Sequence, residues 1–289
     1  MKISCPVCKE TLNKVDKTYK CINGHSFDIA SQGYVNLNMH NSQNTGDNSQ
    51  MIQARTNFLN KCYYSFLLDK INSLLYKEDS LVDLACGEGY YTSKFIAKDK
   101  IGIDLSKQGL KYASKHDKDT TYILSSIFHN PLFDKSADKV ITIFAPIAKE
   151  EIVRILKNNG SFILVKPDEK HLYELKEVLY DKPYLNEIED ISIDGLYIDK
   201  EIKISNHALL NKEDIQNLFM MTPYYNTTSP VDKEKLNSID QLDITFSFII
   251  DVYKKNWCQF FSFVLDCTRP IILALKPIGK CLANKIPIL

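Results

Sequence analysis

Two sets of residues in this sequence have types and spacings that could do chemistry, and the first lies near the N-terminus. In CPVCKETLNKVDKTYKCINGH, Cys5 and Cys8 form a C-x2-C pair, and Cys21 and His25 form a C-x3-H pair. Zinc prefers four thiolate or imidazole ligands in a tetrahedron, and closed Cys3His sets are common structural sites. The twelve residues between the pairs are enough for a short hairpin that returns the second pair to the first. The spacing predicts a structural zinc site.

A disulfide between these cysteines is the alternative. Disulfides need an oxidising compartment, and Met1 is followed at once by the first ligands, with no stretch that resembles a signal peptide. We therefore expect zinc rather than disulfides, in a cytoplasmic protein.

The second set lies in LVDLACGEGYYTSKF, which is typical of a strand, a glycine turn and a helix in succession. Open α/β sheets bind ligands at such strand ends, and Gly87 and Gly89 let the backbone approach a ligand closely. The pattern differs from the dinucleotide G-x-G-x-x-G, because a threonine takes the place of the third glycine. Asp83 and Glu88 would repel a pyrophosphate and attract a cation. S-adenosylmethionine carries a sulfonium and an ammonium, so it suits this loop better than NAD.

A third carboxylate follows the next strand. GIDLS places Asp104 twenty-one residues after Asp83, where a carboxylate can accept both ribose hydroxyls of a nucleoside. The alternative is that Asp83 and Asp104 are helix caps and that Gly87 is a packing glycine. The register of the whole set with the strand ends favours a cofactor site.

These residues need a sheet to hold them, and the hydrophobic pattern supplies one. Alternating short apolar runs and amphipathic segments indicate right-handed crossovers and an α/β fold with a mostly parallel sheet covered on both faces. Two later runs predict antiparallel additions to the sheet, and apolar residues at helical spacing predict one helix before it. The expected strands are 80–85, 101–104, 121–125, 138–144, 160–166, 191–205 and 243–255, and the expected helices 51–75, 90–98, 106–115 and 147–158.

Composition limits the other possibilities. The 289 residues include 36 Lys+Arg and 36 Asp+Glu, so any nucleic-acid contact needs a locally basic face. The most apolar run, 260–275, is interrupted by Asp266, Arg269 and Pro270, so we expect no membrane span. Changes in composition and hydrophobic pattern along the chain predict four parts. They are a zinc-binding module (1–36), a linker with a helical segment (37–78), a catalytic sheet domain (79–255) and a C-terminal extension of unknown role (256–289).

The ordered motifs CPVC…C-x3-H, GYVNL, GD-x3-M-x2-AR-x2-FL, D-x2-CGEGYYT, GID-S, IFAP and MTPYY resemble those of the 23S rRNA (guanine-N1-)methyltransferases. That family acts on a hairpin of domain II and includes the enzyme of tylosin resistance. The resemblance runs from about residue 3 to residue 253. It implies a class I methyltransferase sheet with an N-terminal zinc-ribbon-like module, S-adenosylmethionine and zinc as cofactors, a 23S rRNA hairpin as partner, and a homodimer.

The resemblance also assigns residues. It places zinc on the four ligands above and S-adenosylmethionine against Tyr64, Gly87, Glu88 and His171. The chain departs from the family at Ala85, where many relatives have glycine. The segment SSIFHNPLF offers no carboxylate for the adenine, which leaves Ser126 and backbone groups to bind it.

Three residues are candidates for RNA contact. Arg55, one of only three arginines, follows the polar loop and could give a phosphate a planar bidentate donor; a salt bridge on the helix surface is an equal alternative. Tyr224 and Tyr225 could stack on an extruded guanine or pack in the core.

Two other functions remain open from the sequence: a small-molecule methyltransferase that uses the zinc module as a lid or dimer contact, and a non-catalytic RNA-binding protein. IFAP lacks the Asp/Asn-Pro-Pro-aromatic pattern of amino-group methylases, which agrees with a ring-nitrogen target. The sequence does not identify the group that removes the proton from guanine N1.

Overall fold

A computed structural model describes residues 1–39 and 48–255. The prediction of a separate C-terminal extension, and most of the predicted polar linker, lie outside these ranges. Within them, no helix is both long enough and apolar enough to cross a membrane.

The N-terminal segment forms a small antiparallel sheet in the order β1-β2-β3-β4. The predicted hairpin is present, because β2 and β3 pair from Asn13↔Lys20 to Val15↔Thr18. The backbone amide of Ser4 donates to the Pro131 carbonyl at 2.7 Å, which fixes the module against the larger sheet. The strands are β1 (Ile3–Ser4), β2 (Thr11–Val15), β3 (Thr18–Lys20) and β4 (Ser26–Asp28).

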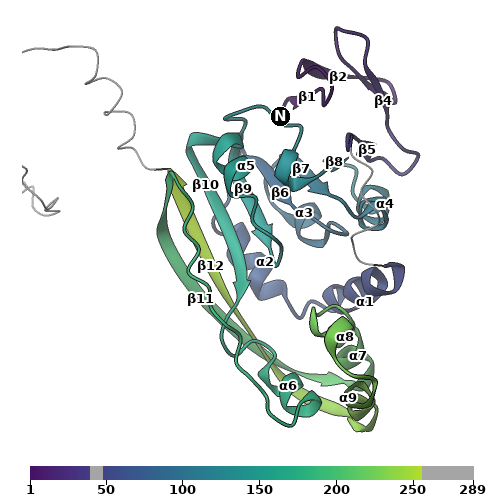
Figure 1. Cartoon of the computed structure of the whole chain (residues 1–289), viewed down its shortest axis with the longest axis vertical. Coiled ribbons are helices and arrows are strands. Elements are labelled where there is room, and N and C mark those ends of the chain that lie inside the picture. Colours follow the sequence, from purple (N-terminus) through teal and green to yellow (C-terminus); the bar gives the residue numbers. More distant parts are fainter. Residues whose placement is uncertain (40–47, 256–289) are drawn as a thin grey trace, which may run out of the picture. The chain divides into compact units, whose positions relative to one another are not determined.

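The larger sheet has eight strands in the order β11-β12-β10-β9-β6-β7-β8-β5, and it confirms the predicted α/β class (Figure 1). Strands β5 to β10 pair in parallel, and β12 runs antiparallel to both β10 and β11. The strands are β5 (Val35–Asn36), β6 (Ser80–Leu84), β7 (Asp99–Asp104), β8 (Thr120–Leu124), β9 (Ala137–Ile143), β10 (Leu156–Pro167), β11 (Leu196–Asn211) and β12 (Gln241–Lys255).

The strand order reverses at β6, whose neighbours are β7 on one side and β9 on the other. Ligands of open α/β sheets bind at such a switch point, outside the carboxyl ends of the strands. Strand β5 lies within the residues expected to form the zinc module, yet it pairs with β8. The first 36 residues therefore contribute one strand to the larger sheet.

Helices cover both faces of the sheet, and they are α1 (Ser49–Asn60), α2 (Ser65–Asn72), α3 (Tyr90–Lys94), α4 (Lys107–His116), α5 (Lys149–Ile155), α6 (Tyr173–Leu179), α7 (Lys212–Met220), α8 (Tyr224–Thr227) and α9 (Pro230–Lys235), with 3-10 turns η1 (Ile127–His129) and η2 (Leu236–Ser238). Successive strand residues point to opposite faces. Ile163 and Val165 of β10 accordingly join one apolar cluster, and Phe162 and Leu164 join the other. Ile3 and Leu12 of the zinc module belong to the second cluster, so the module packs on the sheet domain.

The single helix predicted over 51–75 is wrong, because the structure has two helices. Helix α1 is capped by Asn48, whose side chain accepts from the amides of Gln50 and Met51, each at 2.9 Å. It ends near Cys62, which has φ of 64°. A non-glycine residue in this left-handed region interrupts a helix, and the apolar spacing carries no sign of it. Tyr64 follows directly at the start of α2.

Candidate cofactor and zinc sites

The glycine turn after β6 has two sides. Gly87 has φ of 57° and lies in the wall of a cavity; a Cβ there would come 3.6 Å from Nη1 of Arg55. Gly89 has φ of 77°, and a Cβ there would lie 2.7 Å from the Tyr122 hydroxyl and 2.8 Å from the Ala113 Cβ. Gly89 is absent from the cavity wall and permits close packing behind the turn. It therefore positions the loop, whereas Gly87 faces the cavity.

Asp104 ties the turn to the next crossover. One carboxylate oxygen accepts from the Gly87 amide at 2.8 Å, and the other accepts from the Ser106 amide at 2.6 Å. Ser106 in turn caps α4 by accepting from the Gly109 amide at 3.1 Å. An ionised carboxylate offers about four acceptor positions, which is the chemistry that ligand hydroxyls need.

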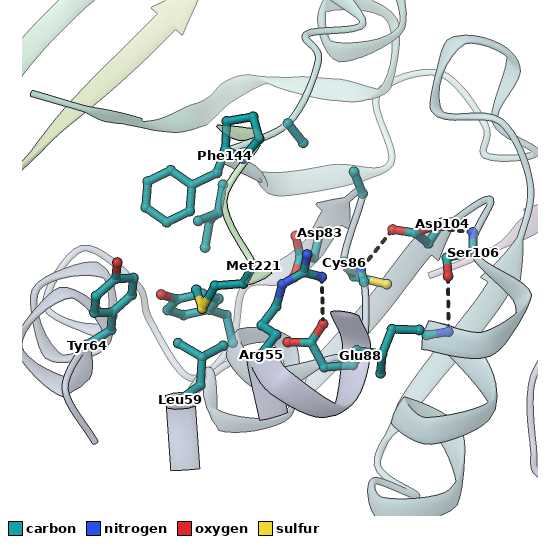
Figure 2. Close-up of a pocket in the computed structure, with 18 residues that line it drawn as sticks. Arg55, Leu59, Tyr64, Asp83, Cys86, Glu88, Asp104, Ser106, Phe144 and Met221 are labelled. Atoms are coloured by element: carbon teal, nitrogen blue, oxygen red, sulfur yellow. Dashed lines mark hydrogen bonds and ion pairs between the residues drawn. The ribbon is translucent and has the colours of Figure 1, made fainter. Parts of the chain in front are cut away.

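These groups surround a cavity of about 340 Å³, which we call the cofactor cavity. Its volume lies within the range of about 300–1,000 Å³ usual for small-molecule sites. Figure 2 shows Asp104 and Ser106 toward one end and Tyr64 and Phe144 toward the other. The lining residues are Ile52, Arg55, Leu59, Tyr64, Asp83, Ala85, Cys86, Gly87, Glu88, Tyr91, Asp104, Ser106, Gly109, Ile143, Phe144, Ala145, Met221 and Pro223.

The cavity is acidic. Asp83, Glu88 and Asp104 line it, and Arg55 donates from Nη1 to Glu88 at 3.1 Å. Burial raises the pKa of Asp83 to about 7; the Thr92 hydroxyl opposes the rise, and the charges of Asp104 and Glu88 add to it. A buried carboxylate is stabilised in its charged form by a nearby cation. The geometry therefore suits a cationic ligand with hydroxyls.

Tyr64 and His171 lie in one aromatic cluster but differ in access to the cavity. Tyr64 lines the cavity and packs edge-on against Phe246 and Phe248. His171 lies outside the lining, with its ring centroid 6.3 Å from that of Tyr64. Burial lowers the pKa of His171 to about 3, so the ring is neutral, and its Nδ1 accepts from the Ser247 amide at 3.3 Å. His171 supports the aromatic wall from behind.

Ser126 lies beyond the cavity wall. Its hydroxyl accepts from the Phe128 amide at 3.2 Å and caps the 3-10 turn η1. The preceding amide, of Ser125, donates to the Asp104 carbonyl at 3.1 Å. The structure thus brings the Ser126 segment to the Asp104 strand end, with the hydroxyl used locally.

The candidate RNA contacts take different places. Arg55 points into the cofactor cavity, where it meets Glu88 (Figure 2). Tyr224 donates from its hydroxyl to Asn186 at 3.2 Å, and Tyr225 packs edge-on against Phe219 with ring centroids 5.5 Å apart. Neither tyrosine lines the cofactor cavity.

The same segment does reach the cavity through other residues, because Met221 and Pro223 line it. Phe144, directly after β9, is a further lining residue, and it belongs to the IFAP motif. Its side chain is 43% exposed, its φ is 53°, and its amide donates to the Val165 carbonyl at 3.1 Å. An apolar residue directly after a strand, at the edge where ligands bind, was the available signal.

A second cavity of about 630 Å³ adjoins the first, and we call it the side cavity. The two cavities share Phe144, Ala145 and Pro223. The charged residues in the wall of the side cavity are Lys149, Lys166, Glu189 and Asp190.

The four predicted zinc ligands converge in the small sheet. Their ligand atoms all lie within 4.8 Å of one another. Nδ1 of His25 lies 3.3 Å from Sγ of Cys21 and 3.6 Å from Sγ of Cys5, and the Cys8 and Cys21 sulfurs are 3.7 Å apart. Tetrahedral zinc, with Zn–S of about 2.3 Å and Zn–N of about 2.0–2.1 Å, puts ligand atoms about 3.5–3.8 Å apart. The donor set fits zinc.

The local backbone favours the thiolate form of Cys8. A hydrogen bond from the Glu10 backbone lowers the pKa of Cys8 to about 6. Two tight turns shape the site: the Lys9 amide donates to the Cys5 carbonyl at 2.8 Å, and the Gly24 amide donates to the Cys21 carbonyl at 3.1 Å. Because thiolate is the form that binds metal, this arrangement agrees with a structural zinc ion.

Comparison with known proteins decides the family. The model described as "Methyltransferase domain" matches residues 75–221, which include the strand end and glycine turn described above. The chain belongs to the methyltransferase family. The zinc-ribbon model described as "RlmA, N-terminal" matches residues 3–39 of this methyltransferase. Both matches agree with the predicted zinc module and S-adenosylmethionine-binding sheet.

Individual relatives are more distant. The methyltransferase is 29% identical over 188 residues to the 23S rRNA (guanine(748)-N(1))-methyltransferase of Streptomyces fradiae, covering 61% of this chain and 67% of that protein. It is 29% identical over 264 residues to YxjB of Bacillus subtilis (strain 168), which is named a putative 23S rRNA (guanine-N(1)-)-methyltransferase. That match covers 83% of this chain and 93% of YxjB. Among solved structures, the YcgJ protein of Bacillus subtilis is 15% identical with a TM-score of 0.43, covering 65% of this chain and 98% of that one.

Proposed function

We propose that this methyltransferase transfers a methyl group from S-adenosylmethionine to N1 of a guanine in a 23S rRNA hairpin. The observation that carries the proposal is the acidic cofactor cavity, which shares Phe144 in its wall with the side cavity. The two relatives named for 23S rRNA guanine-N1 methylation supply the acceptor.

Residues of the cofactor cavity would hold S-adenosylmethionine. Asp104 would accept from the ribose hydroxyls, and Asp83 and Glu88 would face the positive charges of the cofactor. The bound cofactor supplies an electrophilic methyl on a sulfonium. The protein contributes by positioning that methyl in line with the acceptor nitrogen.

The side cavity would receive the acceptor base. Its volume of about 630 Å³ is ample for an extruded nucleoside, and a base paired through N1 has to leave the helix before methylation. Phe144 presents an exposed aromatic ring between the two cavities. Aromatic side chains stack on unpaired bases, so the ring of Phe144 would hold the guanine beside the methyl group.

Positive charge for the RNA backbone would come from two places. Lys149 lines the side cavity. The zinc module adds five exposed lysines, against three exposed carboxylates (Glu10, Asp16 and Asp28), in a chain of zero net charge; the lysines are Lys2, Lys9, Lys14, Lys17 and Lys20. Lysine contacts to phosphates position a nucleic acid without reading its bases. The module would therefore orient the hairpin.

Methylation of purified RNA tests the proposal. An unmethylated 23S rRNA transcript is incubated with the protein and S-adenosylmethionine labelled in the methyl group, and the product is mapped by nuclease digestion and mass spectrometry. We expect one N1-methylguanine in a hairpin. Tight RNA binding without transfer would instead favour a non-catalytic RNA-binding protein, and transfer only to a small molecule would contradict an rRNA substrate. Sedimentation of the protein alone tests the homodimer that the resemblance implies.

A further inference from the structure

N1 methylation of guanine needs a proton acceptor. Guanine N1 carries a hydrogen at neutral pH, and the methyl group can bond to that nitrogen only when the proton has left. A suitable side chain has to lie within hydrogen-bond reach of the bound base. The acceptor therefore belongs in the wall of the side cavity.

The lining leaves few choices. The ammonium groups of Lys149 and Lys166 are hydrogen-bond donors without an acceptor position. Lys166 is also committed, because its Nζ lies 2.7 Å from a carboxylate oxygen of Asp251 on β12. Among the described residues that line this wall, the side chains that can accept a proton are the carboxylates of Glu189 and Asp190.

Glu189 is held close to the edge of the sheet where the two cavities meet. Nζ of Lys166 donates to its carbonyl oxygen at 3.2 Å. Lys166 follows Val165 in β10, and the Val165 carbonyl accepts from the Phe144 amide at 3.1 Å. Two adjacent residues of β10 thus make the contact that fixes Phe144 and the contact that fixes Glu189.

Asp190 lies on the side of the cavity toward Tyr253. Burial raises the pKa of Tyr253 to about 12, and the carboxylates of Asp251 and Asp190 contribute to the rise. The Tyr253 hydroxyl donates to the Ile191 carbonyl at 2.9 Å. Tyr253 of β12 pairs with Phe162 of β10. Phe162 precedes Lys166 by four residues, so the backbones of these two residues are about 13 Å apart along the strand. The chain is thus fixed at the Glu189 carbonyl by Lys166 and at the Ile191 carbonyl by Tyr253, and Asp190 lies between these two contacts.

We propose that Glu189 is the proton acceptor for guanine N1, an assignment that rests on the proposed function. The carboxylate of Glu189 takes the N1 proton, and the electron pair left on N1 attacks the methyl carbon of the sulfonium. The S–CH3 bond breaks as the N1–CH3 bond forms, which leaves neutral S-adenosylhomocysteine, methylated guanine and a protonated Glu189. The proton then passes to solvent, since the Glu189 side chain is exposed.

The test compares Glu189→Gln with a matched control in the same segment, Glu187→Gln. Glu187 is also exposed and lies outside the side-cavity wall, so both variants should fold alike. Single-turnover methylation of the 23S rRNA transcript is followed from about pH 7 to about pH 9. We expect Glu189→Gln to lower the rate constant at neutral pH by roughly 100-fold or more, with unchanged S-adenosylmethionine and RNA affinity, and Glu187→Gln to match the wild type.

The pH profile separates a proton acceptor from a structural residue. The Glu189→Gln deficit should shrink as pH rises, because hydroxide removes the N1 proton unaided. The charged groups facing this site are Lys149 of α5, Lys166 of β10 with its partner Asp251, and the neighbouring Asp190. These groups are present in the wild type and in both glutamine variants. The ratio of variant rate to wild-type rate at each pH therefore removes the effect of their titration.

Three results would overturn the assignment. They are a wild-type rate in Glu189→Gln, a loss of rate in Glu189→Gln that stays constant with pH, and a loss of rate in Asp190→Asn without one in Glu189→Gln. In each of these cases the wild-type enzyme still methylates guanine N1, so the proposed function stands. A wild-type protein that methylates no guanine N1 removes the proposed function, and the role of Glu189 with it.

Discussion

Asp83 should make the affinity for S-adenosylmethionine depend on pH. Its carboxyl is 3% exposed, and burial raises its pKa to about 7. The cationic cofactor should bind the ionised form, so affinity should increase as pH rises through this value. If the pKa returns to its ordinary 3.8 in the complex, the dissociation constant falls about tenfold between pH 6 and pH 8 from this group alone.

Calorimetric titration at several pH values measures this effect, and Asp83→Asn is its control. The amino group of the cofactor titrates in the same way with the wild type and with the asparagine variant. A difference between their profiles of affinity against pH is therefore due to Asp83. Titrations in buffers of different ionisation enthalpy should show release of about half a proton per cofactor from Asp83 at pH 7. Parallel profiles for wild type and variant, with equal proton release, would show that Asp83 does not face the cofactor's charge.

The same group affects the stability of the ligand-free protein. Its folded-state pKa lies above the ordinary value of 3.8, so the folded state holds the proton more tightly than the unfolded state does. This contribution to the free energy of unfolding is complete below about pH 4 and is lost as pH rises through about 7. The melting temperature of the wild type should therefore fall more than that of Asp83→Asn between pH 5 and pH 8.

Three further substitutions test the sites. Asp104→Ala should weaken S-adenosylmethionine binding by about 1.5–3 kcal/mol, because a charged acceptor is lost, and unchanged calorimetric affinity would remove Asp104 from the cofactor site. Ala85→Gly should raise the free energy of unfolding by up to about 1 kcal/mol in a denaturant titration, because Ala85 has φ of 65°; a clear loss of stability would contradict strain there. Cys21→Ser should abolish bound zinc and rRNA methylation but leave cofactor affinity within about threefold, since metal binding supplies folding energy to the module and the cofactor cavity is lined by residues beyond 51. Wild-type methylation by that variant would exclude the module from RNA recognition.

Much of the fold could be predicted because its signals are local. The parallel strands β6 to β10 appear as short apolar runs, and each lies within a few residues of its expected position, whereas the short strand β5 was not predicted. The zinc ligands could be predicted for the same reason, since C-x2-C and C-x3-H each fit within a single turn. The break at Cys62 could not be predicted, because the apolar spacing runs through it while the chain turns to bring Tyr64 against Phe246 and Phe248.

Packing between distant segments decided which side chains face the cavity. Gly87 and Gly89 look equivalent in the sequence, but contact with Tyr122 and Ala113 turns the second one away. The MTPYY segment was expected to offer its tyrosines, yet its Met221 and Pro223 line the cavity.

The sequence by itself determined the four zinc ligands, the α/β class and the acidic glycine turn, because each depends on residues close together in the chain. Only the tertiary structure placed Phe144 between two cavities and Glu189 beside Lys166. The physical reason is that a side chain's exposure depends on what packs behind it. In this protein those neighbours come from strands and loops far away in the sequence.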